Sequence, residues 1–187
     1  MQKYIEKPLL YQRRKFDIRH YMAINCHNGK MKGYWYSEGY IRTTSSEYSV
    51  KNTKDLFTHL TNDAVQKCGQ DYGKFEKGNK ISYAEFQKYL SNYVSPDIDF
   101  QSQIIPKMKE LATDSIRATY SMLDPERREH NFELFGLDFM LDENLNVYII
   151  EVNTNPCLET SCPLLTKIIT PLVENVFKYK LSYIGYV

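Results

Sequence analysis

Three polar side chains stand out in two largely apolar segments: Asp138 in residues 132–141, and Glu151 and Asn153 in residues 146–153. Each segment has the composition of a β-strand, and the short polar stretch between them is typical of a hairpin loop. If the loop sets a register in which paired residue numbers sum to 287 or 289, Asp138 lies opposite Glu151 or one diagonal step from it, on a shared face. Two carboxylates and an amide oxygen are hard donors that suit Mg²⁺ and leave its other positions to water and phosphate oxygens. We therefore predict a Mg²⁺ site at these residues.

The alternative is a half-exposed hairpin whose polar face simply meets water, because any antiparallel hairpin shows this alternation. Against it, Glu151 and Asn153 are poor strand formers at the end of a run of strong ones, and such choices are expected mainly where function requires them. The other face of the hairpin is predicted to join the core. It carries Phe135, Leu137, Phe139 and Leu141 on the first strand and Tyr148, Ile150 and Val152 on the second.

A second polar group lies near the N-terminus, where Lys15, Asp17 and Arg19 alternate along one predicted strand. If a ladder without bulges joins this strand to the next, Arg42 lies opposite Lys15 and near Arg19. Like charges that face one another destabilise a sheet unless an anion lies between them. Arginine presents a planar fork of donors to phosphate or carboxylate groups, so these residues favour an anion-binding face. A solvated basic surface is the alternative, because runs of charge usually have that role.

A second hairpin must position these basic residues. Residues 13–24 and 34–43 are predicted as its strands, with Asn28-Gly29 as a strong two-residue turn. The face opposite the charges is predicted to be core and carries Phe16, Ile18, Met22 and Ile24. The polar residues 44–52 are predicted to form a loop, and residues 70–80 a mobile surface loop.

Amphipathic helices are predicted to cover the sheet. Ser82 and Glu85 have the spacing of a capping box that starts one helix, and residues 104–123 repeat apolar side chains at helical spacing. Residues 166–179 are predicted to form another helix, across the apolar side of the sheet. Its inward residues are expected to be Leu165, Ile168, Ile169, Leu172, Val176 and Phe177. These elements predict an α+β fold, an antiparallel sheet of hairpins with helices packed on one face.

The bulk composition excludes several classes of protein. The chain has 187 residues, of which 42% are hydrophobic, and its 24 basic and 23 acidic residues nearly cancel. No global field therefore favours nucleic acid or a membrane surface. The sequence has no apolar run of about 18 residues and no signal peptide, so we expect no membrane insertion and an intracellular location. The four cysteines lack a metal-binding pattern and are expected to be free thiols.

The hairpin segment resembles the end of the catalytic domain of the tubulin–tyrosine ligase-like family, within the ATP-grasp superfamily. The similarity continues upstream through QKYIEKPLL, RRKFDIR, EGYIRT, HLTN and YGKFEKGN, so it spans nearly the whole chain. The resemblance implies the C-terminal lobe of an ATP-grasp fold. Residues 1–187 would then form a partial catalytic domain from which the N-terminal lobe is absent.

The resemblance also implies roles for individual residues. The corresponding Asp, Glu and Asn of the family hold Mg²⁺ against the phosphates of ATP, which matches Asp138, Glu151 and Asn153. Contacts to the nucleotide phosphates and the reacting carboxyl groups fall on Lys15, Asp17, Arg19 and Arg42, with Lys15, Arg19 and Arg42 as the catalytic candidates. The hinge that holds adenine corresponds to Gln2, Lys3, Tyr4 and Ile5. The HLTN segment adds Thr61 and Asn62 to the nucleotide site, whereas a lone histidine such as His59 is interpreted as structural.

The implied activity is an ATP-dependent ligase that adds glutamate, glycine or tyrosine to a protein carboxyl group, through an acyl phosphate and with release of ADP. The acceptor would be tubulin or another protein with an acidic tail, and the location cytoplasmic, at the cytoskeleton or cilium. Lys74, Lys77 and Lys80 could attract such a tail at low salt, although a merely soluble loop is the alternative. Two further hypotheses are a noncatalytic nucleotide- or tubulin-binding remnant and an ATP-grasp ligase with a small-molecule product.

Overall fold

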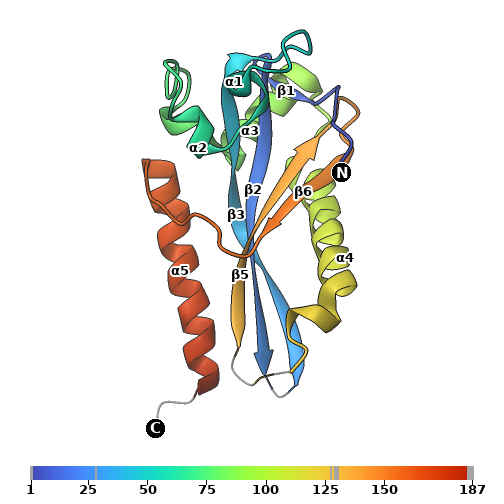
Figure 1. Ribbon diagram of the computed structural model, residues 1–187, viewed down its shortest axis with the longest axis vertical. Coiled ribbons are helices and arrows are strands. Elements are labelled where there is room, and N and C mark those ends of the chain that lie inside the picture. The colour runs from blue at the N-terminus through green and yellow to red at the C-terminus, as the bar shows by residue number, and fades with distance from the viewer. Residues whose placement is uncertain (1, 28, 127, 129–130, 185–187) are drawn as a thin grey trace.

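A six-stranded antiparallel sheet forms the centre of the computed structural model, which describes residues 2–27, 29–126, 128 and 131–184 (Figure 1). The strand order is β4-β3-β2-β5-β6, and β1 pairs with β2. The strands are β1 (Leu10–Tyr11), β2 (Arg14–His27), β3 (Lys30–Glu47), β4 (Lys80–Ser82), β5 (Phe132–Leu141) and β6 (Val147–Asn153). Both predicted hairpins are present, β2–β3 and β5–β6, and β2 joins them side by side. Asn28, in the predicted turn, lies outside the described residues.

The helices are α1 (Leu56–His59), α2 (Asp63–Gln66), α3 (Tyr83–Tyr89), α4 (Ile105–Leu123) and α5 (Pro163–Ile184). The predicted capping box starts α3, because the Ser82 side chain accepts from the Glu85 amide and the Glu85 carboxylate accepts from the Ser82 amide. Short π-helical turns follow α3 at Leu90–Val94 and precede α4 at Phe100–Ile104. Among the described residues, no helix is both long and apolar enough to cross a bilayer.

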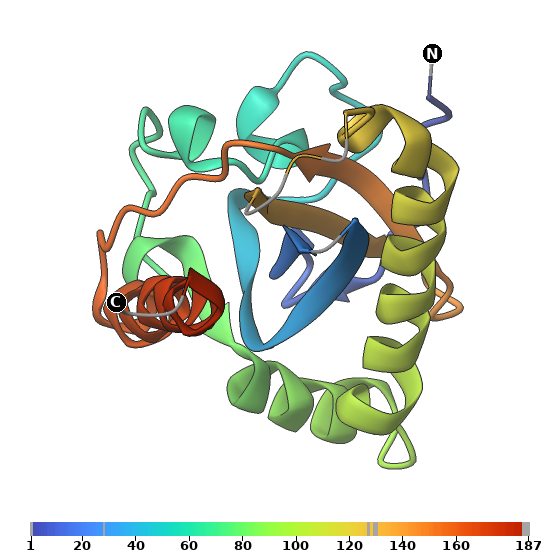
Figure 2. The ribbon, with the colours of Figure 1, turned by 90° about the horizontal axis from the view of Figure 1, so that it is seen from below.

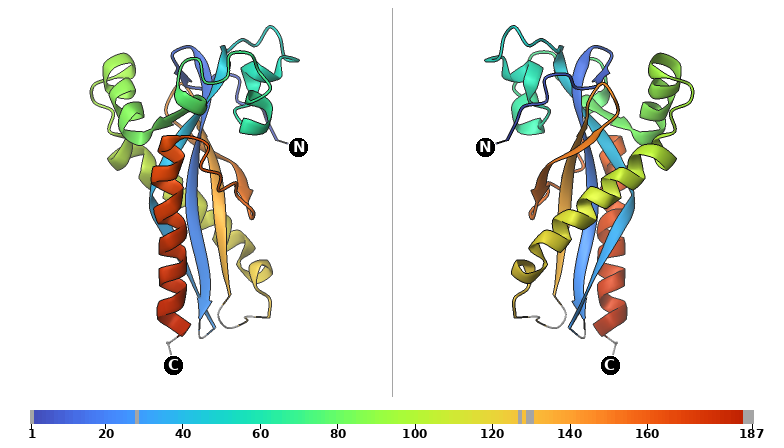
Figure 3. Two further views of the ribbon diagram at one scale, coloured as in Figure 1. Left: turned by 90° about the vertical axis from the view of Figure 1, so that its left-hand side faces the viewer. Right: turned by 90° about the vertical axis from the view of Figure 1, so that its right-hand side faces the viewer.

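One face of the sheet carries the main core, covered by α3 and α4 (Figures 2 and 3). Its centre contains the predicted core residues of both hairpins. They are Phe16, Ile18, Met22 and Ile24 of β2 and Phe135, Leu137, Phe139 and Leu141 of β5, all no more than 6% exposed. The α+β class and the antiparallel sheet are therefore confirmed.

Helix α5 lies on the opposite face of the sheet, which corrects the prediction for residues 166–179 (Figure 3). Tyr21 and Tyr40 form a second apolar patch on this face, and the predicted inward residues Leu165, Ile168, Ile169 and Leu172 bury against it. These two tyrosines continue the polar face of the sheet beyond Arg19 and Arg42, so the sequence pattern did not mark them as core. Phe177, predicted to face inward, is 53% exposed.

A β-bulge in the β5–β6 hairpin shifts the pairing beyond the polar residues. Asp138 lies directly opposite Glu151, as predicted, and the register then shifts so that Phe139 pairs with Ile149. Ile150 is therefore the extra residue of β6.

This bulge exchanges the faces of β6. Val147 and Ile149 pack against the main core. The prediction that Tyr148, Ile150 and Val152 form one core face is therefore wrong. Tyr148 pairs with Met140 on the polar face and is 40% exposed, whereas Val152, on the other side of the bulge, still pairs with Leu137 although it is 37% exposed. The prediction assumed uninterrupted pairing, and one added residue inverts the alternation on one side of the bulge.

A second irregularity, between β2 and β3, decides where Arg42 lies. The register shifts between the pairs Met22–Trp35 and His20–Gly39, and Arg42 consequently lies opposite Asp17. The prediction that it faces Lys15 is wrong for this reason. The basic residue thus meets a carboxylate across the ladder and not a like charge.

His20 lies beside this irregularity and is fully buried. Its Nε2 lies 2.8 Å from the Tyr36 carbonyl oxygen, which can only accept, so Nε2 carries the proton and Nδ1 accepts from the Tyr83 hydroxyl at 2.8 Å. The ring stacks on Trp35 with centroids 3.7 Å apart. Burial lowers the pKa of His20 from 6.5 to about 3, and nearby Lys109 acts in the same direction, outweighing the bond to Tyr36.

We expect His20 to make the protein less stable in mild acid. Below about pH 6.5 the unfolded chain binds a proton that the folded chain excludes down to about pH 3, so the free energy of unfolding falls by up to about 1.4 kcal/mol per pH unit. Urea unfolding between about pH 7 and about pH 5 measures this slope. A His20→Asn variant should be less stable at neutral pH but show a shallower slope. An equal slope in both proteins would contradict the buried neutral histidine.

Two segments predicted as loops are more ordered than expected. Residues 44–47 continue β3, because Thr44 and Ser45 are buried and hydrogen-bonded. The segment 70–80 is tied to the sheet by buried Asn79, whose side chain donates to Thr43 O at 3.1 Å and accepts from Gly73 N at 2.7 Å. Lys80 is the first residue of β4, and its Nζ lies 2.6 Å from an Asp63 carboxylate oxygen. It is therefore unavailable to attract an acidic tail.

Candidate functional site

Asp138 is the centre of a buried network of charges on the polar face of β2, β3 and β5. Arg19 donates to both of its oxygens, from Nε at 2.5 Å and from Nη2 at 3.1 Å. Arg42 Nη2 lies 2.8 Å from Asp138 Oδ2 and also donates to Asp17, which receives Arg42 Nε at 2.7 Å. Thr61 donates to Asp17 Oδ2 at 2.5 Å. The structure thus joins five of the predicted site residues.

Charge balance explains why this network can be buried. Arg19, Arg42, Asp17 and Asp138 are each less than 8% exposed, and two guanidinium groups face two carboxylates. Burial alone would raise the pKa of Asp138, but Arg42 and Arg19 outweigh it and hold the pKa below its usual value. For the same reason the ion pairs keep the pKa of both arginines above the ordinary value despite burial. Arg19, Arg42 and Asp138 therefore carry their charges at neutral pH.

The predicted Mg²⁺ ligands lie together on this face. Glu151 is exposed, directly opposite Asp138, and has no hydrogen-bond or ion-pair partner in the described part of the chain. The Asn153 amide nitrogen lies 3.5 Å from Asp138 Oδ2, so its side chain points at the carboxylate. No group of three His, Cys, Asp or Glu side chains among the described residues could hold a metal. A site here needs the Asn153 oxygen and further ligands from water or phosphate, which suits Mg²⁺.

Lys15 lies one alternation along β2 from Asp17, on the same face. Its Nζ donates to the His59 carbonyl oxygen at 2.9 Å and lies 4.7 Å from the centroid of the Tyr4 ring. Burial lowers its pKa, although Asp17 acts in the opposite direction. The His59 ring bridges the Tyr4 hydroxyl and the Asn52 carbonyl oxygen, which agrees with its interpretation as structural. Lys15 is thus held beside the network and not within it.

The predicted adenine hinge lies along the outer edge of the β5–β6 hairpin. Residues 2–5 line a cavity of about 490 Å³ together with residues 6–7, 142–144 and 148–150. Gln2 Nε2 donates to the Ile150 carbonyl oxygen at 3.4 Å. Tyr4 connects this cavity to Lys15, whose Nζ lies 3.3 Å from the Tyr4 hydroxyl.

A cavity of about 430 Å³ adjoins the buried network and contains residues that the sequence patterns did not indicate. Arg19, Arg42 and Asn153 line it on one side. The missed residues are Tyr40, Asp63, Lys67, Asn155, Cys157 and Glu159. Tyr40 could have been found, because it shares a strand face with Arg42 two residues later. Asn62, predicted at the site, is exposed and does not line this cavity.

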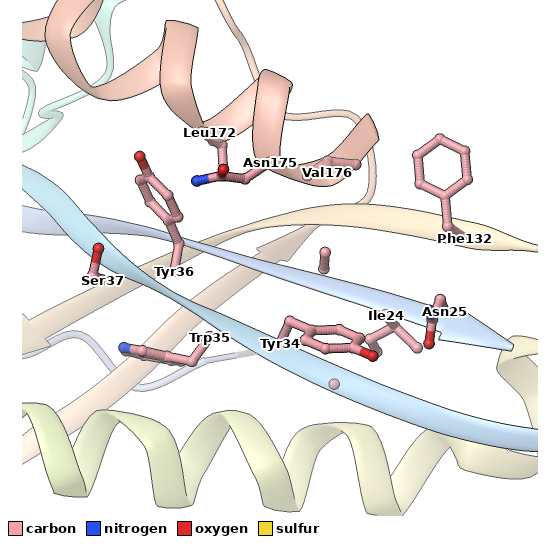
Figure 4. Close-up of a pocket in the computed structure, with 12 residues that line it drawn as sticks. Ile24, Asn25, Tyr34, Trp35, Tyr36, Ser37, Phe132, Leu172, Asn175 and Val176 are labelled. Atoms are coloured by element: carbon pink, nitrogen blue, oxygen red, sulfur yellow. The ribbon is translucent and has the colours of Figure 1, made fainter. Parts of the chain in front are cut away.

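A separate cavity of about 450 Å³ lies between α5 and the far end of the β2–β3 hairpin (Figure 4). Aromatic and aliphatic side chains such as Tyr34, Trp35, Phe132 and Leu172 line it, with amides at its rim. It contains no charged side chain and shares no residue with the network. It therefore does not suit the anionic ligands expected of the candidate site.

Known proteins of one family are similar to this chain over almost its whole length. The model of the tubulin-tyrosine ligase family matches residues 1–184. The chain is 33% identical to "Tubulin glycylase 3D" of Tetrahymena thermophila over 186 residues and 33% identical to "Tubulin glycylase 3B" of Drosophila melanogaster over 182 residues. It is 32% identical to "Probable tubulin polyglutamylase TTLL2" of Mus musculus over 185 residues. These matches cover 98%, 95% and 95% of the chain but only 18%, 24% and 32% of the relatives.

Proposed function

This chain belongs to the tubulin-tyrosine ligase family, and from that premise we propose that it forms part of an ATP-dependent ligase that joins an amino acid to a protein carboxyl group. The observation that carries the proposal is the buried network on one sheet face. Asp138 links Arg19 and Arg42 there, directly opposite Glu151, which is exposed and without a partner among the described residues. Such an arrangement offers cations for transferring phosphoryl groups and oxygens for the accompanying metal.

The proposed chemistry has two steps. An acceptor carboxylate oxygen attacks the γ-phosphorus of ATP, the bond to the bridging oxygen breaks and ADP leaves. The amine nitrogen of the incoming amino acid then attacks the acyl carbon of the acyl phosphate, loses a proton and expels inorganic phosphate. Both steps depend on positioning and charge neutralisation more than on a side-chain nucleophile.

The network supplies the groups that these steps need. Arg19 and Arg42 each have five N–H donors, of which the carboxylate bonds use only part, so further donors remain for phosphate or carboxylate oxygens. Lys15 adds a third cation beside them. Asp138, Glu151 and Asn153 would hold Mg²⁺, which when bound offsets negative charge on the phosphates. Residues 2–5 would contact the adenine in their cavity, and Asp17 and Thr61 keep Arg42 in place.

The names of the relatives suggest the substrates. Glycylases and polyglutamylases of tubulin are similar over nearly the whole chain, so we propose tubulin, or another protein with an acidic tail, as acceptor. The amino acid would be glycine, glutamate or tyrosine. A tubulin substrate would place the protein in the cytoplasm, at the cytoskeleton or cilium.

Turnover tests the proposal directly. We expect ADP release when the chain is incubated with Mg-ATP, tubulin and one of the three amino acids, and a matching mass increase of tubulin. Omitting tubulin or the amino acid should remove the signal. Saturable Mg-ATP binding with no turnover in any of these mixtures would contradict catalysis by this chain and favour the alternative of a noncatalytic nucleotide-binding remnant.

A further inference from the structure

Gly136 lies at a crowded point of the polar face. It pairs with Tyr21 of β2 and Asn153 of β6, two residues before Asp138 on β5 and therefore on the same face. A Cβ atom at this position would lie 2.7 Å from Pro156 Cβ and 3.2 Å from Arg19 Nη1. Its φ lies outside the left-handed region, so the backbone itself does not require glycine. Glycine is required at this position because the neighbouring atoms leave no space for a side chain.

We propose that Gly136 is a positioning residue for Arg19, because the volume that a side chain would fill is shared by the Arg19 guanidinium and the Pro156 ring. In the position from which Nε and Nη2 bond Asp138, the guanidinium lies so close to Gly136 that an added Cβ would be 3.2 Å from Nη1 and 3.5 Å from Cζ. The catalytic part of this inference rests on the proposed function. The geometric part does not.

The segment after β6 completes the site that holds the Arg19 guanidinium. Residues 154–162 run across the sheet to the start of α5 (Figure 1), and Tyr21 donates to the Cys157 carbonyl oxygen at 3.3 Å. Asn153 Nδ2 donates to the Gly136 carbonyl oxygen at 3.3 Å. Pro156 is buried between these two contacts. Any group added at Gly136 must therefore displace the anchored segment, the guanidinium or both.

Arg19 also has a glycine on its other neighbouring strand. A Cβ atom at Gly39 of β3 would lie 2.6 Å from the Arg19 carbonyl oxygen. That contact constrains the Arg19 backbone, whereas Gly136 constrains the side chain. Gly136 is consequently the position at which the guanidinium can be disturbed with the least change to the backbone.

The test compares Gly136→Ala with Gly33→Ala, a matched change in the same sheet at which the added Cβ meets nothing within 4 Å. The NMR signal of the Arg19 Nε–H, assigned with Arg19→Lys, reports the bond to Asp138 without reference to activity. We expect Gly136→Ala to shift or broaden this signal and to lower kcat about tenfold or more, with a smaller change in Mg-ATP affinity. Gly33→Ala should change none of these.

The double variant Gly136→Ala/Pro156→Gly separates positioning from packing. It removes the contact with the anchored segment and leaves only the one with Arg19, so stability should recover while the Arg19 signal and kcat remain altered. Recovery of stability, the Arg19 signal and kcat together in the double variant would overturn the inference. An Arg19 signal that is unchanged in both variants would also overturn it. If Gly136→Ala does not fold, the Arg19 signal of the double variant answers the same question. If the wild type does not turn over, catalysis by this chain is contradicted, and the Arg19 signal still tests the positioning role of Gly136.

Discussion

Replacement of Asp138 by asparagine is expected to abolish turnover and to lower the free energy of unfolding by about 3 kcal/mol or more. The side chain is 5% exposed and balances two guanidinium groups that are themselves buried. An amide of nearly the same shape leaves Arg19 without a counter-charge, and Arg42 with Asp17 alone. Loss of a partner from a buried ion pair is costly because the remaining charge stays desolvated. The same change removes a predicted Mg²⁺ ligand.

Urea unfolding and ADP release measure the two effects in one set of proteins. Glu133→Gln is the matched control, because Glu133 lies on the same strand, is exposed and has no partner among the described residues. It should leave both quantities within about 0.5 kcal/mol and twofold of the wild type. If Asp138→Asn is as stable as this control, the charge network does not hold the site together.

Replacement of Glu151 by glutamine is expected to separate binding from stability. Glu151 is exposed and unpaired in the described part of the chain, so its loss should change the free energy of unfolding by less than about 0.5 kcal/mol. As a proposed direct ligand it should nevertheless weaken Mg-ATP binding by at least about 10-fold to 100-fold, the range typical of residues that only support metal ligands. Calorimetric titration measures the affinity, and Glu133→Gln is again the control.

The sequence predicted the parts of the fold that depend on local patterns. The strands of both hairpins, the capping box at Ser82 and helix α4 follow from alternation, cap residues and helical periodicity. The pairing of Asp138 with Glu151 was one of two arrangements that the sequence left open. It depends on the bulge at Ile150, because the register next to the loop, in which Phe139 pairs with Ile149, would otherwise place Asp138 opposite Ile150.

Two bulges account for the main errors. Arg42 lies far from the β2–β3 turn, and one irregularity near His20 moved its partner from Lys15 to Asp17. The irregularity lies beside His20, whose ring contacts Tyr83 of α3 and Trp35 of the paired strand. No local pattern marks such contacts. An ion pair between Arg42 and Asp17 replaced the expected cluster of like charges.

Tertiary packing explains what else was missed. Helix α5 covers the polar face because Tyr21 and Tyr40 extend it with an apolar patch, and tyrosines alone do not indicate which side they face. The cavity residues Asp63, Lys67 and Glu159 come from segments that meet only in the fold. Gly136 carried no signal beyond being a glycine in a strand, and its importance depends on where Arg19 and Pro156 lie.

Titration of Mg-ATP into the chain and into Glu151→Gln shows whether the polar face of β5 and β6 holds the metal and the phosphates, on which the proposed activity depends. We expect saturable binding by the wild type that disappears when EDTA removes Mg²⁺, and that weakens at least about tenfold in Glu151→Gln but not in Glu133→Gln. Equal affinity of the wild type and Glu151→Gln, or no binding by a folded wild type, would contradict a metal and phosphate site on this face.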